Sequence, residues 1–177
     1  MARANTRLRY PLMASPHPVL PDEIRHAKWP HEIFLINLVF NHILVFASTF
    51  GVYSTFPWMV MIVPTISLII TTYIAVRARQ VRCGSESTFI KAHWWLAEKR
   101  NKQFMVLLIA ACVFGTAGYA LAQALSWSKV ATIAILGGFG LLPFMVSLLV
   151  LIVLGNAAMY DARHNKMPKD YPLAGKG

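Results

Sequence analysis

The chain has 177 residues, of which 56% are apolar and only 14% are charged, and its formal net charge is +10. A soluble domain carries about 25% charged residues, so this composition argues against a soluble globular protein. The basic residues lie beside long apolar stretches, which excludes nucleic acid as the expected partner and indicates a lipid bilayer with anionic lipid headgroups instead.

Three long stretches without any Asp, Glu, Lys or Arg mark the part of the chain suited to lipid. They cover residues 33–76, 103–128 and 130–160. A helix needs about 20 apolar residues to cross a bilayer, so the first stretch is long enough for two spans. We therefore predict an all-α integral membrane protein with four transmembrane helices. These form two antiparallel hairpins, with short interfacial helices on the cytoplasmic side.

The chain opens with a basic, proline-rich cytoplasmic arm over residues 1–30. Within it, Pro21 followed by two acidic residues predicts the start of a short interfacial helix over 22–28, which Trp29-Pro30 should end. The first transmembrane hairpin follows over 31–76, with spans at about 31–53 and 58–76. Pro64 should kink the second span because it removes a backbone donor.

Residues 77–103 form a basic cytoplasmic loop that contains an amphipathic helix from about residue 88. This helix is expected either in the membrane plane or as a cytoplasmic extension of the third span. The second hairpin covers 104–160, with spans at about 104–125 and 130–154, and Pro143 should kink the fourth span. Residues 161–177 form a polar cytoplasmic tail.

The Lys and Arg residues are distributed unevenly between the two sides of this arrangement. Of the 17, five lie in residues 1–30, seven in the middle loop and four in the tail, whereas only Lys129 lies in a link between paired spans. By the positive-inside rule, both termini are expected in the cytoplasm. The expected location is the inner (cytoplasmic) membrane, with the mitochondrial inner membrane as the alternative.

The first two spans carry the main candidate site, a set of polar side chains expected to turn away from lipid. An ionisable residue inside a membrane is a functional candidate by default. His42 is therefore a candidate haem ligand, proton relay or quinone contact; the alternative is a neutral histidine hydrogen-bonded to Thr65 or an asparagine. The candidate intramembrane residues are Asn37, Asn41, His42, Thr49 and Thr65.

A cofactor within this chain alone is not expected. A haem held by two histidines needs a second histidine at the depth of His42, and the sequence offers none there. The other histidines lie toward the basic side, where Asp-x-x-His and Glu-x-x-His spacings are weak metal motifs. The metal candidates are His26, His31, His93, His164 and Asp161.

Small residues recur along the last two spans, at spacings that place them on one helix face. Such stripes let two backbones approach closely in lipid, either within a hairpin or against another subunit. The third span carries Ala111, Gly115, Gly118 and Ala122, and the fourth carries Ala134 and Gly138 among further glycines.

No nucleotide-binding, hydrolase or zinc-protease motif occurs in the sequence. We therefore expect a non-enzymatic multi-pass subunit or accessory protein of a larger inner-membrane complex, with other membrane protein subunits as partners. Three alternatives stay open. The first is a redox component associated with quinone or haem through His42, the second is an oligomeric small transporter or channel, and the third is an interfacial metal-dependent enzyme.

Overall fold

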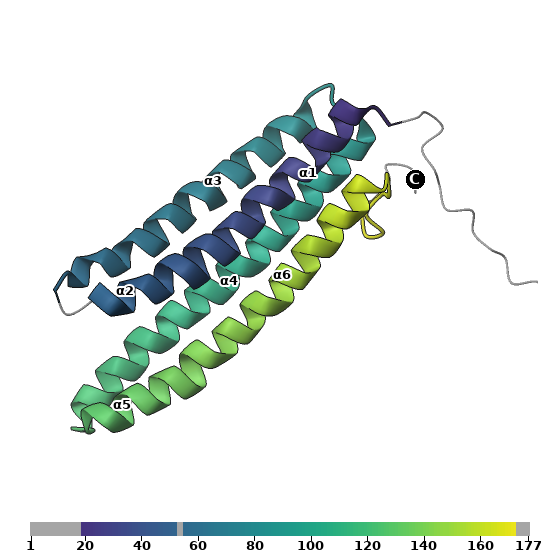
Figure 1. The fold of residues 1–177 in the computed structure, drawn as a ribbon. Helices are drawn as coiled ribbons and strands as arrows, with labels where there is room; N and C mark the ends of the chain where they lie inside the picture. The colour runs from purple at the N-terminus through teal and green to yellow at the C-terminus, as the bar shows by residue number, and fades with distance from the viewer. Residues whose placement is uncertain (1–18, 53–54, 173–177) are drawn as a thin grey trace, which may run out of the picture.

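The computed structural model describes residues 19–52 and 55–172, and the described chain is built from helices without any strand (Figure 1). Within these residues, four helical stretches are long and apolar enough to cross a membrane. This confirms the prediction of an all-α chain with four candidate spans. The four are Pro21–Thr49, Ile62–Cys83, Thr88–Ala124 and Lys129–Arg163. The first 18 residues of the basic arm and residues 53–54 and 173–177 lie outside the described part.

The first helical stretch is unbroken, and it consists of α1 (Pro21–Ile36), a π-helical segment η1 (Asn37–Val45) and α2 (Phe46–Val52). The predicted start at Pro21 is correct, and the Glu23 carboxylate accepts a hydrogen bond of 3.0 Å from the Leu20 backbone N–H. No separate interfacial helix ends at Trp29, because Pro30 lies inside α1. Pro30 removes a single backbone donor, and α1 is buried along this face through Ala27 and Phe34.

The second stretch begins with a 3-10 turn, η2 (Pro57–Met61), and continues as α3 (Ile62–Cys83). Pro64 lies in the first turn of α3, and Pro143 lies in the first turn of α6. Both prolines lie inside continuous helical stretches, because η2 leads directly into α3 and η3 directly into α6. Each proline lies just after a change of helix type, from 3-10 to α at Pro64 and from π to α at Pro143.

The third stretch is one 37-residue helix, α4 (Thr88–Ala124), which Ser87 caps by accepting from the Ile90 N–H. The helix of the basic loop is thus an extension of the third candidate span, one of the two predicted alternatives. Neither proline nor glycine occurs between residues 88 and 114 to interrupt it. Trp127 N–H bonds to Ala122 O and Ser126 adopts φ 52°, so a Schellman-type turn ends the helix.

The last stretch comprises α5 (Lys129–Ile135), a second π-helical segment η3 (Leu136–Leu141) and α6 (Leu142–Arg163). After α6, Asn165 adopts φ 56° and the chain reverses onto α4. Lys99 pairs with Asp170 at 3.1 Å, and the ring of Trp95 packs against that of Tyr171. The described part of the tail therefore packs on the bundle.

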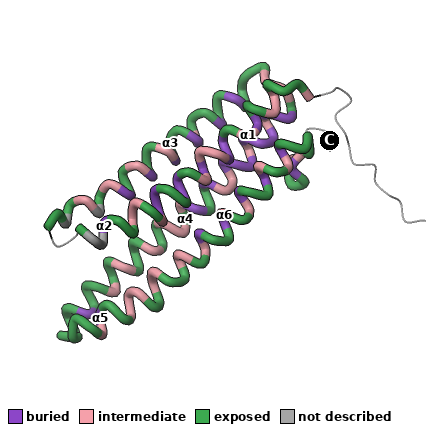
Figure 2. The backbone as a smooth tube through the Cα atoms, in the orientation of Figure 1, coloured by how far each residue is buried: buried purple, intermediate pink, exposed green. Residues whose placement is uncertain are grey.

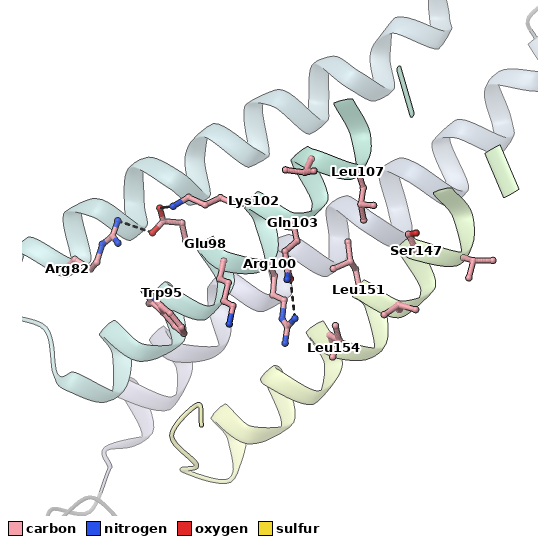
Figure 3. Close-up of a pocket in the computed structure, with 14 residues that line it drawn as sticks. Arg82, Trp95, Glu98, Arg100, Lys102, Gln103, Leu107, Ser147, Leu151 and Leu154 are labelled. Carbon is pink, nitrogen blue, oxygen red and sulfur yellow. Dashed lines mark hydrogen bonds and ion pairs between the residues drawn. The ribbon is translucent and has the colours of Figure 1, made fainter. Parts of the chain in front are cut away.

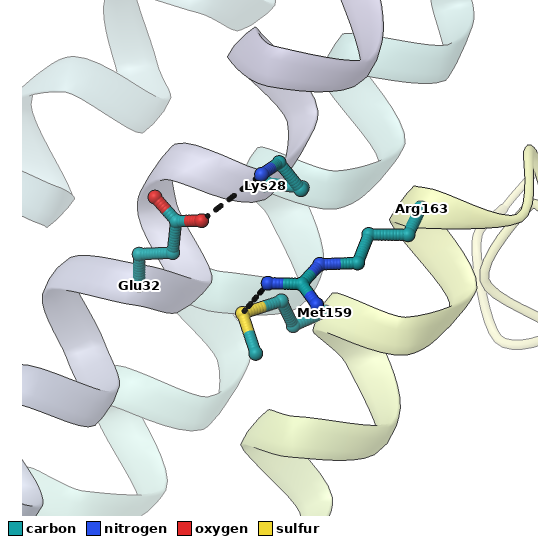
Figure 4. A network of polar contacts seen from close by, with 4 residues as sticks. All are labelled: Lys28, Glu32, Met159 and Arg163. Carbon is teal, nitrogen blue, oxygen red and sulfur yellow. Dashed lines mark hydrogen bonds and ion pairs between the residues drawn. The ribbon is translucent and has the colours of Figure 1, made fainter.

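The apolar core lies where α1, α3, α4 and α6 run side by side (Figure 2), and the end formed by α5 is mostly exposed. The buried members of this core come from all four stretches: Phe34, Leu38, Ile74, Phe104, Leu148 and Leu151. α1 and α6 approach closely at Gly155, where an added Cβ would lie 2.9 Å from Leu35 Cδ2. Nearer the chain ends, Lys28 and Glu32 of α1 lie across from Met159 and Arg163 of α6 (Figure 4).

Replacing Gly155 with leucine is expected to destabilise the bundle, because the new side chain would have to displace Leu35. Overpacking of this kind costs about 1–3 kcal/mol. The matched control is Gly115→Leu on α4, where an added Cβ meets no described atom within 4 Å. Thermal unfolding followed by circular dichroism in mild detergent should show a lower melting temperature for Gly155→Leu alone. Equal melting of both variants would contradict the close approach.

Candidate functional site

Asn37 and Asn41 join the first helical stretch to α3. The Asn41 side-chain amide donates to Asn37 Oδ1 at 3.1 Å and to the Val63 carbonyl at 2.9 Å. The Asn37 amide donates to Ser67 Oγ at 3.2 Å. Ser67 and both asparagines are buried. The bonds to Ser67 and Val63 cross between helices, and such contacts are worth about 0.6–2 kcal/mol each in membranes, while the Asn41–Asn37 bond orients the two amides within η1.

His42 lies in the same π-helical segment but makes a different kind of contact. Its Nδ1 lies 3.0 Å from the Asn37 carbonyl oxygen. A carbonyl can only accept, so Nδ1 carries the proton and Nε2 of the neutral ring presents a lone pair. Nε2 is buried and has no hydrogen-bond partner among the described residues. A buried acceptor without a partner is unusual in a folded protein and marks His42 as a candidate functional residue.

The π-helical geometry of η1 creates this contact. Phe46 N–H bonds to Asn41 O, five residues back, as in a π-helix. Residues five apart then lie about one turn from each other, which brings His42 over the Asn37 carbonyl. An α-helical spacing places these two positions on different faces, so sequence periodicity could not predict the contact. Single π turns are frequent at functional sites.

An apolar cavity of about 180 Å³ adjoins His42. The His42 ring packs edge-on against Phe104 and Phe144, with centroids 4.9 and 6.4 Å away. The other cavity residues come from η1–α2, η2–α3, α4 and α6. They are Phe46, Met61, Val63, Pro64, Leu108, Cys112 and Phe144. The lining is therefore apolar apart from the His42 ring.

The two threonines of the predicted site do not join the asparagine cluster. Thr65 is exposed and its hydroxyl donates to Met61 O at 2.7 Å, while Thr49 is buried and donates to Phe46 O at 2.6 Å. Sequence reasoning missed Ser67, which supplies the polar contact from the second stretch that was expected of Thr65. The available signal was the spacing of Val63, Ser67 and Thr71, four residues apart along one face of α3.

The small residues of the last two stretches fall into two groups. Gly118 faces Leu136 and Gly140 faces Phe114, and an added Cβ would lie 2.6 and 2.8 Å from those side chains. Each of these glycines makes room for a large residue of the other stretch. Gly115, Gly137 and Gly138 instead have no described atom within 4 Å of an added Cβ. Of the predicted alanines, Ala122 is buried, Ala111 is half-buried and Ala134 is exposed.

Two of the five metal candidates meet at the opposite end of the bundle. His31 Nε2 lies 3.2 Å from His93 Nδ1, and His93 Nε2 lies 3.2 Å from the Lys166 carbonyl. Because that carbonyl must accept, His93 donates through Nε2 and receives the His31 proton on Nδ1. Both rings are buried, and this chain of hydrogen bonds ties α1 to α4 and to the segment after α6.

The two remaining histidine candidates lie apart from this pair, whereas Asp161 is near enough to His93 for its charge to act on that ring. His26 is exposed and lies 3.7 Å from Asp22, and exposed His164 stacks on Tyr160 and hydrogen-bonds to its carbonyl. Asp161 lies on the last turn of α6. Within the described ranges 19–52 and 55–172, no three His, Cys, Asp or Glu side chains are grouped to hold a metal ion.

Glu98 is a buried carboxylate that is not among the metal candidates listed from the sequence. Arg82 Nη2 and Lys102 Nζ each lie 2.9 Å from one of its oxygens. A buried charge is tolerated when it is paired in this way. The spacing of Glu98 and Lys102, four residues apart on a helix, predicts the ion pair between these two side chains.

Comparison with protein-family models, curated proteins and solved structures finds no match to this chain. The arrangement therefore has to be interpreted from its own geometry. It combines a polar contact between helices, a histidine with an unused acceptor beside a small cavity, and glycines open to the outside.

Replacing His93 with phenylalanine is expected to release the segment after α6, because Lys166 loses its buried donor. Trypsin should then cleave after Lys166 faster than in the unmodified protein, since cleavage follows local opening. His164→Phe is the matched control, because His164 is exposed and contacts only its own helix turn. Unchanged digestion of His93→Phe, with the helical signal intact, would refute a restraining role for this contact.

Proposed function

We propose that this protein is a non-enzymatic multi-pass subunit of a larger inner-membrane complex, and that it binds a partner transmembrane helix on the open glycines of α4 and η3. The observation that carries the proposal is the lack of any described neighbour at Gly115, Gly137 and Gly138. The partner is expected to present a helix with small residues of its own, because close packing of backbones needs them on both sides.

Lipid acyl chains alone would pack poorly against these three glycines. Glycine in a helix interior costs about 1 kcal/mol relative to alanine, and a fluid acyl chain offers no compensating close contact. Only 6% of the most apolar window of Thr88–Ala124 is buried within the chain, compared with 33% for Pro21–Thr49. The second half of α4 therefore keeps most of its apolar surface for contacts outside this chain.

The proposed orientation places the ends of α1, α3 and α6 that carry the basic residues in the cytoplasm. Among the described residues, Lys129 is the sole Lys or Arg at the opposite end, where α4 joins α5. The positive-inside rule supports this topology with both termini inside.

Substituting Gly115 and Gly138 with leucine is expected to reduce recovery of the partner without unfolding the bundle. Leucine side chains at these two glycines should weaken binding of the partner helix roughly tenfold, given an overpacking cost of about 1–3 kcal/mol. The measurement is the amount of partner that co-purifies with tagged protein from native membranes in mild detergent. Ala117→Leu is the control, since Ala117 is an exposed small residue on the same helix.

Two results would count against the subunit proposal. One is recovery of the same partner in equal amounts with the glycine variant and the Ala117→Leu control. The other is a strictly monomeric protein without any partner in native membranes.

A second candidate function is quinol binding at His42, favoured by the unused Nε2 acceptor beside an apolar cavity. A quinol hydroxyl can donate to Nε2, whereas a quinone carbonyl has no hydrogen to offer the lone pair. The cavity of about 180 Å³ falls below the range of about 300–1,000 Å³ for drug-sized ligands. This space suits a single ring with its tail directed into lipid better than a porphyrin.

If His42 binds a quinol, protein purified from membranes should carry extractable quinol, measured as quinone after oxidation in air, and His42→Ala should lose most of it. Loss of one hydrogen bond of this kind corresponds to about a threefold to tenfold decrease in affinity. The His164→Ala variant, altered at an exposed histidine, should retain the wild-type amount. Equal quinone content in all three proteins would eliminate this function.

A further inference from the structure

A groove of about 760 Å³ lies between α4 and α6, separate from the His42 cavity and from the open glycines (Figure 3). One end is bordered by four basic side chains, here called the rim: Arg82, Lys99, Arg100 and Lys102. The other end is lined mainly by apolar side chains of α4 and α6, here called the trough: Val106, Leu107, Val146, Val150, Leu151 and Leu154. The lining is completed by Trp95, Glu98, Gln103 and Ser147.

The rim keeps an excess of positive charge after its internal ion pairs are formed. Glu98 shares its single charge between Arg82 and Lys102, at 2.9 Å from each. Lys99 pairs with Asp170 at 3.1 Å. Within the described residues Arg100 forms no ion pair with a carboxylate, so two positive charges remain uncompensated at this end of the groove.

Arg100 is also incompletely hydrogen-bonded. Its Nη1 donates to Gln103 Oε1 at 3.1 Å, but its Nε is buried and has no partner in the described part of the chain. A buried donor without a partner costs free energy, and more when it belongs to a charged group. An anionic oxygen beside the guanidinium would satisfy this donor with a charge-assisted hydrogen bond.

The groove changes from basic to apolar along its length. Lys99 and Val106 are seven residues apart on α4, which corresponds to about 10 Å along the helix. Figure 3 shows Leu154 near Arg100 and Ser147 near Leu107, so α6 borders the same space over this distance. A ligand that fills it therefore needs a negative group at one end and a hydrocarbon chain at the other.

We propose that the groove binds an anionic phospholipid, with the phosphate on Arg100 and one acyl chain along the trough. Charge complementarity selects the headgroup, because the rim has two uncompensated positive charges. The apolar trough selects a lipid over a free anion, which would leave that surface unused. Basic pockets between helices near the cytoplasmic surface recognise lipid headgroups in this manner. The inference goes beyond the proposed subunit role and does not require a protein partner.

The test uses the purified full-length chain in nanodiscs of phosphatidylcholine, with phosphatidylglycerol added in increasing amounts. Lipid that remains bound after transfer to mild detergent is identified by native mass spectrometry. The unmodified protein should retain phosphatidylglycerol in preference to phosphatidylcholine. Arg100→Gln should bind phosphatidylglycerol about fivefold more weakly, the change expected for one basic residue near a membrane surface.

Two further variants separate a built site from general attraction. Arg79→Gln removes a charge from an exposed position on α3 outside the groove lining, and its lipid retention should match that of the unmodified protein. Val150→Trp fills the trough without changing charge and should abolish selective retention. Where Val150→Trp fails to fold by circular dichroism, Val146→Trp replaces it.

Several outcomes would overturn the proposal. Equal losses in Arg100→Gln and Arg79→Gln would show attraction to the whole basic surface. Competition by inorganic phosphate or glycerol phosphate as effective as that by the lipid would show a free-anion site. An effect of Arg100→Gln without any effect of the tryptophan variants would show that the rim binds an acidic group of another kind. The amount of partner recovered with the glycine variants tests the subunit proposal only, so the two proposals can fail independently.

Discussion

The Asn41 amide holds α3 against the first helical stretch by donating one hydrogen to the Val63 carbonyl, while its other hydrogen bonds to Asn37 within the same π-helical segment. These groups are buried away from water, so separating the helices would leave buried polar groups unsatisfied. Ser67 extends the same contact through Asn37. With the asparagines used in this way, His42 packs on aromatic rings of α4 and α6 and keeps one nitrogen free. A structural contact and a candidate ligand site thus arise from one π-helical segment.

The two ends of the bundle differ in how completely their side chains are paired. At the basic end, the His31–His93–Lys166 chain, the Glu98 pairs and the Lys99–Asp170 pair connect elements that are far apart in sequence. At the other end, α5 is mostly exposed, and Gly137 and Gly138 of η3 have no described atom within 4 Å of an added Cβ. Since local stability follows the number of buried contacts, the basic end is expected to be rigid. The α5 end is expected to gain order from whatever binds it.

Charge-free stretches predicted the number of candidate spans, because a helix that crosses hydrocarbon must be apolar over a fixed length. The same reasoning could not place Pro30 inside a helix, since a proline's local penalty can be outweighed by tertiary burial of Ala27 and Phe34. The contact of His42 with the Asn37 carbonyl depends on a π turn that no 3.6-residue periodicity contains. The His31–His93 contact joins residues 62 positions apart, and a single sequence gives no means to pair them.

The length of α4 bears on where its functional surfaces lie. Thirty-seven residues extend over about 55 Å, whereas the hydrocarbon core is about 30 Å thick and needs about 20 of them. Counting 20 residues back from Ala124 reaches Met105, so the helix before that point is expected to project into the headgroup layer and beyond it. Lys99, Arg100 and Lys102 fall just outside this boundary, and Val106 and Leu107 fall just inside it. The change from rim to trough thus coincides with the expected surface of the hydrocarbon, which is where the phosphate and the acyl chain of a lipid meet.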